Sequence, residues 1–281
     1  MEGYDILIRG SLLLLDKTRF IKNAYIYIKN GVIEDYGEEP VPQDYEYATL
    51  VLGGENRVIA PAYGIPYTDA LLYHIHPAER GTFEKRIKLI EKTDRETLLQ
   101  SLYTVLYELS LHGVAVVGVE TIEPSIVLEA AKTSKVKIVP IGCKSGRCIA
   151  VSRIEPSVEY DEHRIYIDKL EELMIYRNHI APMFTKRFSY SVCALKPLEL
   201  FSATQTAYAL EGMKWGITKN TPAMITVYNF NDLPLYRAGL VDLFDLIRTC
   251  KRVETLIAGQ EIIVDGGEHL TIGKRLVKDG G

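Results

Sequence analysis

Two histidines and an aspartate in one short stretch are the first residues of this chain that could do chemistry. His74 and His76 flank a single isoleucine, and Asp69 precedes them. Imidazole nitrogens and carboxylate oxygens are common ligands of zinc and iron, so Asp69, His74 and His76 could hold one divalent metal, Zn or Fe, if further ligands converged on them. The alternative is that the two histidines belong to a partly exposed loop and bind nothing.

A second candidate site is the loop at residues 142–148, which reads Gly-Cys-Lys-Ser-Gly-Arg-Cys. Lys144 and Arg147, together with backbone amides exposed by the glycines, could hold a carboxylate or a phosphate, which predicts a small anionic ligand. Cys143 and Cys148 could bind a metal or react, but the simpler interpretation is a loop with two incidental thiols. The loop lacks the spacing of a phosphate-binding P-loop.

Glu120 is a third candidate, because it ends an apolar stretch, residues 114–120, with the composition of a buried strand in a parallel sheet. A carboxylate at a strand end could act in catalysis, as could Asp69. Equally, Glu120 could do no more than pair with Lys144 or Arg147. The sequence contains no nucleophile elbow, no dinucleotide-binding glycine motif and no zinc-protease helix motif.

Apolar periodicity predicts the elements that position these residues. Residues 4–10 form a strand, and Asn30-Gly31 supplies the two positive-φ positions of a hairpin turn within residues 24–33. The C-terminal part adds a strand at 222–228, a helix at 242–251 and a hairpin at 253–266. The middle alternates between helices and strands. Its predicted elements are a helix that begins with a capping box at 93–96 and stops at Gly113, the strand 114–120, a helix at 124–134, strands at 136–142 and 188–194, and a helix at 198–213.

Residues 57–76 resemble the first barrel strand of the amidohydrolase superfamily, and more narrowly its chlorohydrolase and cytosine-deaminase branch. In that branch the segment has the form V-x-x-P-G-x-x-x-x-H-x-H, and Val58 and Pro61 match its beginning. The two metal-binding histidines of the family correspond to Tyr67 and Asp69 in this chain. The resemblance implies an α/β fold, a TIM-like (β/α) barrel flanked by a composite β-sandwich domain built from both chain ends.

The length of the chain limits the size of the barrel. If residues 1–57 and 215–281 form the composite β domain, residues 58–214 leave roughly 155 residues for the barrel, whereas a complete eight-unit barrel takes about 250. We therefore expect a truncated or incomplete barrel. Because truncation leaves a strand edge or an apolar face open, we also expect a homodimer or a hetero-complex.

Two functions of different classes follow from this resemblance. In the first, the chain has lost its metal centre and its hydrolytic activity, because Tyr67 and Asp69 replace the histidines and the predicted strand at 188–194 holds no aspartate. Such a protein would have a ligand-binding, regulatory or scaffolding role, would need no cofactor, and would bind its ligand through Tyr67, Lys144 and Arg147. In the second, the chain is a divergent metal-dependent hydrolase. It would act on non-peptide C–N bonds of a small cyclic amide, an amidine or a nucleobase-like substrate.

Composition further limits the classes of function that the chain can have. The chain has 281 residues, 47% of them hydrophobic, and a formal net charge of -4, so no basic excess predicts a nucleic-acid partner. The apolar run at residues 11–15 is far too short to span a bilayer, and no signal-peptide pattern surrounds it. Four cysteines make no disulfide framework in a chain of this size, which favours a cytoplasmic location.

Overall fold

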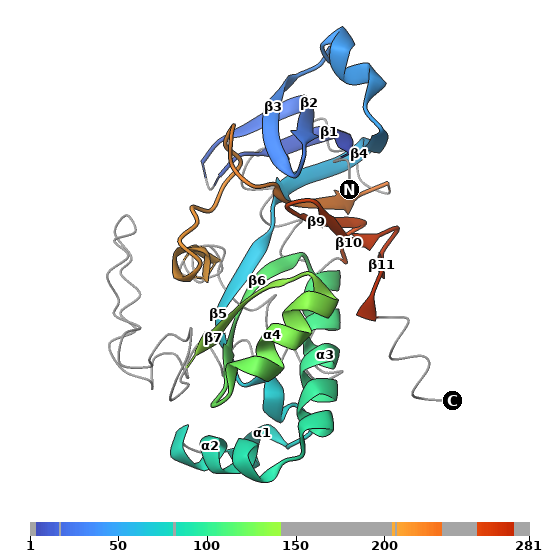
Figure 1. Ribbon diagram of the computed structural model, residues 1–281. Coiled ribbons are helices and arrows are strands. Elements are labelled where there is room, and N and C mark those ends of the chain that lie inside the picture. Colours follow the sequence, from blue (N-terminus) through green and yellow to red (C-terminus); the bar gives the residue numbers. More distant parts are fainter. Residues whose placement is uncertain are drawn as a thin grey trace. The chain divides into compact units, whose positions relative to one another are not determined.

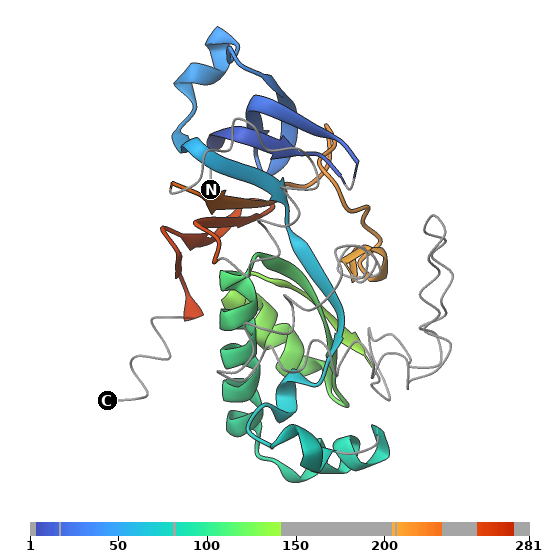
Figure 2. The ribbon, with the colours of Figure 1, turned by 180° about the vertical axis from the view of Figure 1, so that it is seen from behind.

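The computed structural model of the chain is shown from two sides in Figures 1 and 2. It describes residues 4–16, 18–80, 83–141, 204–205, 207–231 and 252–272. The predicted strand at 188–194, the predicted helix at 242–251 and the loop at 142–148 lie outside these residues. The fold is mixed α/β, and the chain divides into two compact units. The first unit comprises Met1–Ala62, Ser110–Ala115 and Trp215–Leu270, and the second comprises Tyr63–Leu109, Val116–Lys214 and Thr271–Gly281.

An eight-stranded sheet, with strands from both ends of the chain, forms the first unit (Figure 1). Its order is β11-β10-β9-β8-β4-β1-β2-β3. The strands are β1 (Asp5–Leu14), β2 (Phe20–Lys29), β3 (Val32–Glu38), β4 (Leu50–Pro61), β8 (Met224–Asn229), β9 (Thr255–Ala258), β10 (Glu261–Asp265) and β11 (Glu268–His269). Strand β1 pairs antiparallel with β2 and parallel with β4, and β4 pairs antiparallel with β8. The two chain ends therefore share one hydrogen-bonded sheet.

The hairpin between β2 and β3 confirms the predicted turn. Asn30 and Gly31 have φ angles of 52° and 76°, the left-handed conformation that this two-residue turn requires. Strand β4 begins at Leu50, before the segment that resembles a barrel strand, and Gly53 and Gly54 within it both have positive φ. The pairing of β1 with β4 shifts register just after Gly10 and Gly54, so this part of the strand is irregular.

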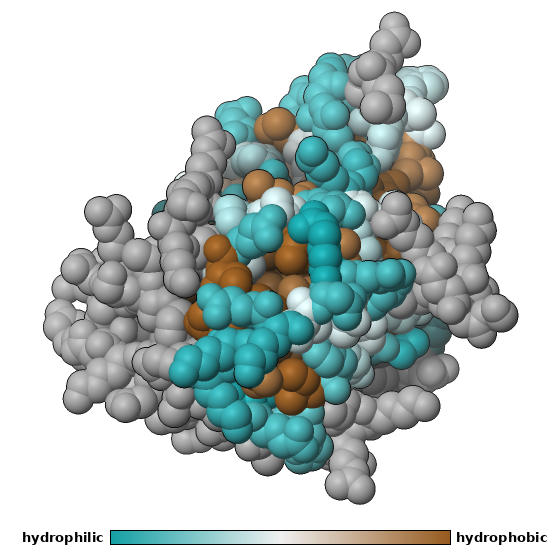
Figure 3. Space-filling model, turned by 60° about the horizontal axis from the view of Figure 1, so that its bottom comes forward, coloured by the Kyte–Doolittle hydropathy of each residue, from teal (hydrophilic) through white to brown (hydrophobic). Residues whose placement is uncertain are grey.

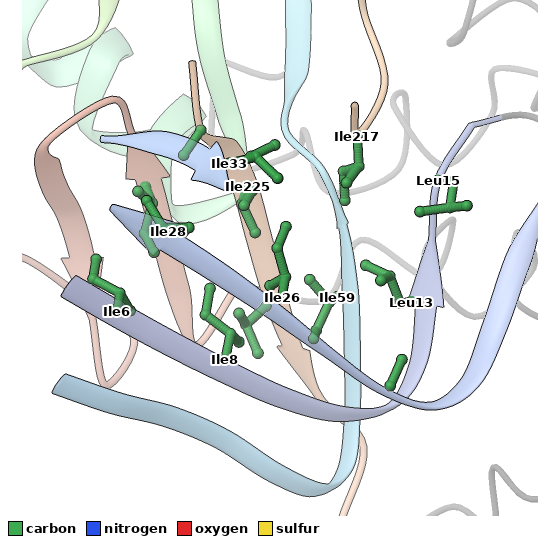
Figure 4. Close-up of a cluster of buried hydrophobic side chains, with 14 residues drawn as sticks. Ile6, Ile8, Leu13, Leu15, Ile26, Ile28, Ile33, Ile59, Ile217 and Ile225 are labelled. Carbon is green, nitrogen blue, oxygen red and sulfur yellow. The ribbon is translucent and has the colours of Figure 1, made fainter. Parts of the chain in front are cut away.

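Buried branched side chains fill the interior of the first unit. Figure 4 shows isoleucines and leucines from β1, β2, β3, β4 and β8 that point toward one another. The cluster consists of Ile6, Ile8, Leu13, Leu15, Ala24, Ile26, Ile28, Ile33, Ile59, Ile217, Ala223, Ile225, Val227 and Ile257. Burying one such isoleucine or leucine side chain contributes about 1.5–3 kcal/mol to folding. This apolar interior holds the two chain ends together.

A three-stranded sheet with the order β5-β6-β7 organises the second unit. Its strands are β5 (Tyr63–Thr68), β6 (Val114–Glu120) and β7 (Lys137–Ile141), and β6 and β7 are parallel. Helices α3 (Arg95–Leu111) and α4 (Pro124–Ser134) connect these strands, as the sequence predicts. All seven residues of β6 are buried, which agrees with the continuous apolar pattern of the first six.

The segment between β5 and α3 is more structured than the sequence indicates. It contains the short 3-10 helix η2 (Ala70–Leu72) and the helices α1 (Pro77–Arg80) and α2 (Phe83–Lys92). Another 3-10 helix, η1 (Gln43–Tyr47), lies between β3 and β4. The predicted capping box is wrong in its cap, because the Asp94 side chain, rather than Thr93, accepts from the Thr97 backbone N–H at 2.9 Å. Thr93 instead donates to the Leu89 carbonyl. Within the described ranges, no helix is long and apolar enough to cross a membrane.

Candidate functional site at the strand ends

The first buried carboxylate of the second unit belongs to Asp69, directly after β5. Its side chain is fully buried, and the Arg80 guanidinium donates from Nη1 to Asp69 Oδ1 at 3.0 Å. Arg80 is itself only 1% exposed. It also donates from Nε to the Ile75 carbonyl at 2.8 Å and from Nη2 to the Tyr73 carbonyl at 3.5 Å. Arg80 therefore ties the end of β5 to the loop that follows η2.

The second buried carboxylate belongs to Glu120, the last residue of β6. Arg86 Nε donates to Glu120 Oε1 at 3.0 Å and to Oε2 at 2.9 Å, and Arg86 Nη2 lies 2.8 Å from Oε2. Both side chains have no exposed surface. The sequence left two alternatives for Glu120, a catalytic role or a pairing with Lys144 or Arg147, and named Arg86 in neither. Lys144 and Arg147 lie outside the described residues.

One face of helix α2 points toward the interior, and Arg86 lies on that face. Arg86 and Ile90, one helical turn apart, are buried. The remaining described charged residues of the helix are exposed: Lys85, Lys88, Glu91 and Lys92. Figure 3, in which the end with α1 and α2 comes forward, shows a largely hydrophilic surface there. The helix thus covers a buried ion pair with a solvated face.

Strands β5 and β6 approach closely just before the two carboxylates. A Cβ added to Gly118 would stand 1.9 Å from the Pro66 carbonyl oxygen, so only glycine allows this approach. Asp69 follows Pro66 by three positions and Glu120 follows Gly118 by two. The end of β5 also carries the Thr68 hydroxyl, which is buried and has no hydrogen-bond partner in the described part of the chain.

The electrostatic state of these strand ends is set by the two arginines. Removing a carboxylate and a guanidinium from water costs several kcal/mol per ion, and only good geometry offsets that cost. Both pairs have hydrogen-bonding distances between 2.8 and 3.0 Å. Each carboxylate therefore faces a guanidinium at hydrogen-bonding distance. In this arrangement the arginines, rather than water, neutralise Asp69 and Glu120.

His74 contacts helix α3 rather than the two carboxylates. It is among the exposed residues, and its Nδ1 is 2.8 Å from the hydroxyl of Ser101 on α3. Its ring nitrogens are nevertheless partly shielded from water, and this partial burial and then the nearby Arg80 guanidinium lower the pKa of His74, while Asp94 opposes them. His74 is therefore neutral near pH 7 and anchors its loop to α3. His76 is exposed.

Of the remaining predicted site residues, one is described in part and the others are not described. Tyr67 lies in β5, where only its backbone is described. Cys143, Lys144, Arg147 and Cys148 lie outside the described residues, so their predicted anion site stays a prediction. Sequence reasoning missed Arg80 and Arg86. The one signal for Arg86 was its helical spacing from Ile90, which places a charged residue on an otherwise apolar face.

A complete metal site is not assembled by the described side chains. In the ranges that the structure describes, no three His, Cys, Asp or Glu side chains come together as metal ligands. Catalytic zinc usually has histidine nitrogens among its ligands. The strand ends offer carboxylate oxygens that already contact guanidinium groups. These residues do not fit zinc without further ligands and a change of partner at Asp69 or Glu120.

Comparison with known proteins gives no sequence match but clear matches of fold. No family model matches the chain, and no curated protein matches it. Among solved structures, a mutant of atrazine chlorohydrolase from Arthrobacter aurescens TC1 complexed with zinc and atraton has a TM-score of 0.65 at 12% identity, covering 98% of each chain. An adenosine deaminase from Xanthomonas campestris with bound zinc has a TM-score of 0.63 at 8% identity, covering 99% of this chain and 97% of that chain. Ochratoxinase from A. niger has a TM-score of 0.58 at 9% identity, covering 96% and 98%.

These matches correct one expectation. We expected no cofactor, because the resemblance implies that Tyr67 and Asp69 take the place of two metal-binding histidines. Two of the three solved structures named above hold zinc, which is a divalent metal, so the expectation is wrong. The resemblance implies that the ligands available at the end of β5 have changed. It does not imply that the chain binds no metal.

Proposed function

We propose that this chain, which has the fold of the amidohydrolase superfamily, is a divergent metal-dependent hydrolase acting on non-peptide C–N bonds. The substrate class that we propose is a small cyclic amide, an amidine or a nucleobase-like molecule. The observation that supports the proposal is the match over nearly the whole chain to a chlorohydrolase and a deaminase. At this level of identity the match establishes fold alone, so the chemistry is our proposal.

The proposed catalytic groups are Asp69 and Glu120. Both are carboxylates at the ends of neighbouring strands of the second unit, and both are shielded from water. A carboxylate can accept or donate a proton in a reaction once its guanidinium partner no longer occupies its oxygens. We propose that one of the two carboxylates moves a proton in the reaction. The arginine that binds this carboxylate would determine when its oxygens are free to do so. No metal ligand is assigned in this proposal, because the described side chains do not form a group of metal ligands.

The finer architecture belongs to the same proposal. We propose that residues 58–214 form a truncated TIM-like barrel and that residues 1–57 and 215–281 form a composite β-sandwich domain. The strand ends of a barrel carry its functional loops. Tyr67, Lys144 and Arg147 would then belong to the same rim as Asp69 and Glu120, where they would orient a substrate that carries an anionic group.

The experiment is a hydrolysis screen followed by mass spectrometry of the products. Protein stripped of metal is supplied with Zn²⁺, Mn²⁺ or Fe²⁺ and offered cyclic amides, amidines, aminotriazines and nucleobases. We expect hydrolysis of at least one compound that depends on added metal and is lost in Glu120→Gln. Glu96→Gln is the matched control, because Glu96 is an exposed glutamate at the start of α3. Absence of hydrolysis with every metal would contradict the proposal.

A second candidate function is favoured by the two arginine contacts. A carboxylate held by a buried guanidinium is not free to exchange protons, which suits a binding protein better than an enzyme. In that case the chain binds compounds of the same classes without hydrolysing them. A thermal-shift measurement with the same compounds separates the two candidates, since the binding protein gains stability and forms no product.

A further inference from the structure

The start of β5 is held by a side-chain hydroxyl from a distant part of the chain. The Thr204 hydroxyl accepts a hydrogen bond from the Gly64 backbone N–H at 3.3 Å and donates to the Gly64 carbonyl oxygen, also at 3.3 Å. Thr204 is completely buried, and both residues belong to the second unit. One hydroxyl therefore supplies the acceptor and the donor that a neighbouring strand supplies in a regular sheet.

The residues around Thr204 also pack directly against Gly64. They are helical at 204–205 and 207–210. A Cβ added to Gly64 would lie 2.7 Å from the Cβ of Ala207 and 3.2 Å from the ring of Tyr208, and both of these residues are buried. An alanine Cβ cannot rotate out of the way, so this approach requires glycine. Hydrogen bonds and packing thus fix the same residue of β5.

We propose that Thr204 is a positioning residue, whose hydroxyl fixes β5 at Gly64 and thereby sets where the Asp69 carboxylate lies. The inference rests on the proposed function, because that function assigns Asp69 to the reaction. Thr204 acts through the backbone of β5 rather than through a contact with a substrate. Its loss would therefore move a reacting group without removing one.

The strand between Gly64 and Asp69 is built to carry a displacement along its length. Asp69 follows Gly64 by five positions. Pro66 lies between them, and its ring restricts the backbone. Its carbonyl oxygen lies so close to β6 that a Cβ added to Gly118 would stand 1.9 Å from it. Because the strand has little freedom to bend, a shift at Gly64 reaches Asp69, and a misplacement of about 1 Å at a reacting group can cost roughly a hundredfold in rate.

The test compares Thr204→Val with a matched variant, Thr226→Val. Valine keeps the branched shape of threonine and lacks the hydroxyl. Thr226 is also completely buried, and its hydroxyl donates to the Ala60 carbonyl at 3.2 Å within the first unit. Each variant removes one buried contact between a hydroxyl and the backbone, so both should lose a similar amount of stability in denaturant unfolding. A purely structural role predicts that they behave alike in every other measurement too.

The first readout does not depend on activity. In nuclear magnetic resonance spectra, the backbone amide signals of Thr68 and Asp69 should move in Thr204→Val and stay in place in Thr226→Val. Thr204→Ser, which keeps the hydroxyl, should retain the wild-type positions. If Thr204→Val does not fold, Thr204→Cys replaces it, because a thiol forms only weak hydrogen bonds, and a smaller movement is expected. Signals of Thr68 and Asp69 that do not move in the folded variant would overturn the inference.

The second readout uses a substrate found in the hydrolysis screen. Thr204→Val should lower kcat by about tenfold or more and change KM by less than about threefold, because the lost contact affects the chemical step rather than binding. Thr226→Val should change neither. Equal losses of kcat in the two variants would overturn the inference. Moved signals of Asp69 in a protein that hydrolyses nothing would support the positioning role and contradict the proposed function, whereas hydrolysis by the wild type with unmoved signals would do the reverse.

Discussion

The guanidinium of Arg86 contacts both carboxylate oxygens of Glu120, and neither side chain has any exposed surface. This pair joins helix α2 to the end of β6. A buried pair of this kind is costly to form and more costly to break, because removing one partner leaves an uncompensated charge in the interior. Its presence at a strand end identifies a place where charge is retained in spite of that cost.

Breaking this pair should destabilise the chain strongly. We expect Arg86→Met to lower the free energy of unfolding by about 3–5 kcal/mol, and the double variant Arg86→Met/Glu120→Leu to recover much of that loss. Denaturant unfolding measures both. The exposed pair between Arg95 and Glu129, also close at 2.7 Å, is the control. Arg95→Met should cost less than about 1 kcal/mol, and similar losses at both pairs would contradict the buried role of Arg86.

Gly118 should tolerate no side chain. In Gly118→Ala the new Cβ would meet the Pro66 carbonyl oxygen at 1.9 Å, so β5 and β6 would have to separate. We expect a loss of at least about 1–3 kcal/mol in denaturant unfolding. In Gly37→Ala the nearest atom is the movable side chain of Tyr25 at 3.2 Å, and the loss should be smaller. An unfolding free energy of Gly118→Ala equal to that of the wild type would refute the close approach of the two strands.

His269 should make stability depend on pH. Burial lowers its pKa from 6.5 to about 4, so the unfolded chain binds a proton more readily than the folded chain. Its contribution is present above pH 6.5 and is lost as the pH falls from 6.5 toward 4, up to about 3 kcal/mol. Thermal unfolding of His269→Gln should show a flatter decline over this window than the wild type. Parallel curves would show that His269 does not cause the decline.

Self-association stays a prediction from the sequence. A truncated barrel leaves apolar surface or a strand edge uncovered, and a second copy of the chain can cover it. We expect light scattering at micromolar concentration to report a mass near that of two chains. A monomeric mass that stays constant across concentrations would count against the prediction.

Much of the framework was predictable because short sequence patterns determine it. The Asn30-Gly31 turn and the apolar run of β6 depend on neighbouring residues alone. The contacts of Arg80 and Arg86 were not predictable. Each arginine meets a carboxylate on a different element of the second unit, so the pairing depends on how helices α1 and α2 pack against strand ends. Charged residues in a helix usually face solvent. The spacing of Arg86 from Ile90 is a local signal that Arg86 points inward, but it does not identify the carboxylate partner.

The metal ligands were predictable from the sequence only in part. That Tyr67 and Asp69 take the place of two histidines stays a prediction from the resemblance, and the inference from it to the absence of a cofactor was wrong. Substitution at two positions shows which ligands have changed. It does not show what the tertiary structure gathers from elsewhere in the chain.

The metal content of the chain tests the central claim most directly. Protein is purified without chelator, dialysed against Zn²⁺, Mn²⁺ and Fe²⁺ in turn, freed of excess metal and subjected to elemental analysis. A metal-dependent hydrolase of this fold should retain about one divalent ion per chain, and Asp69→Asn should retain less. Wild-type protein that retains none of the three ions would contradict the account.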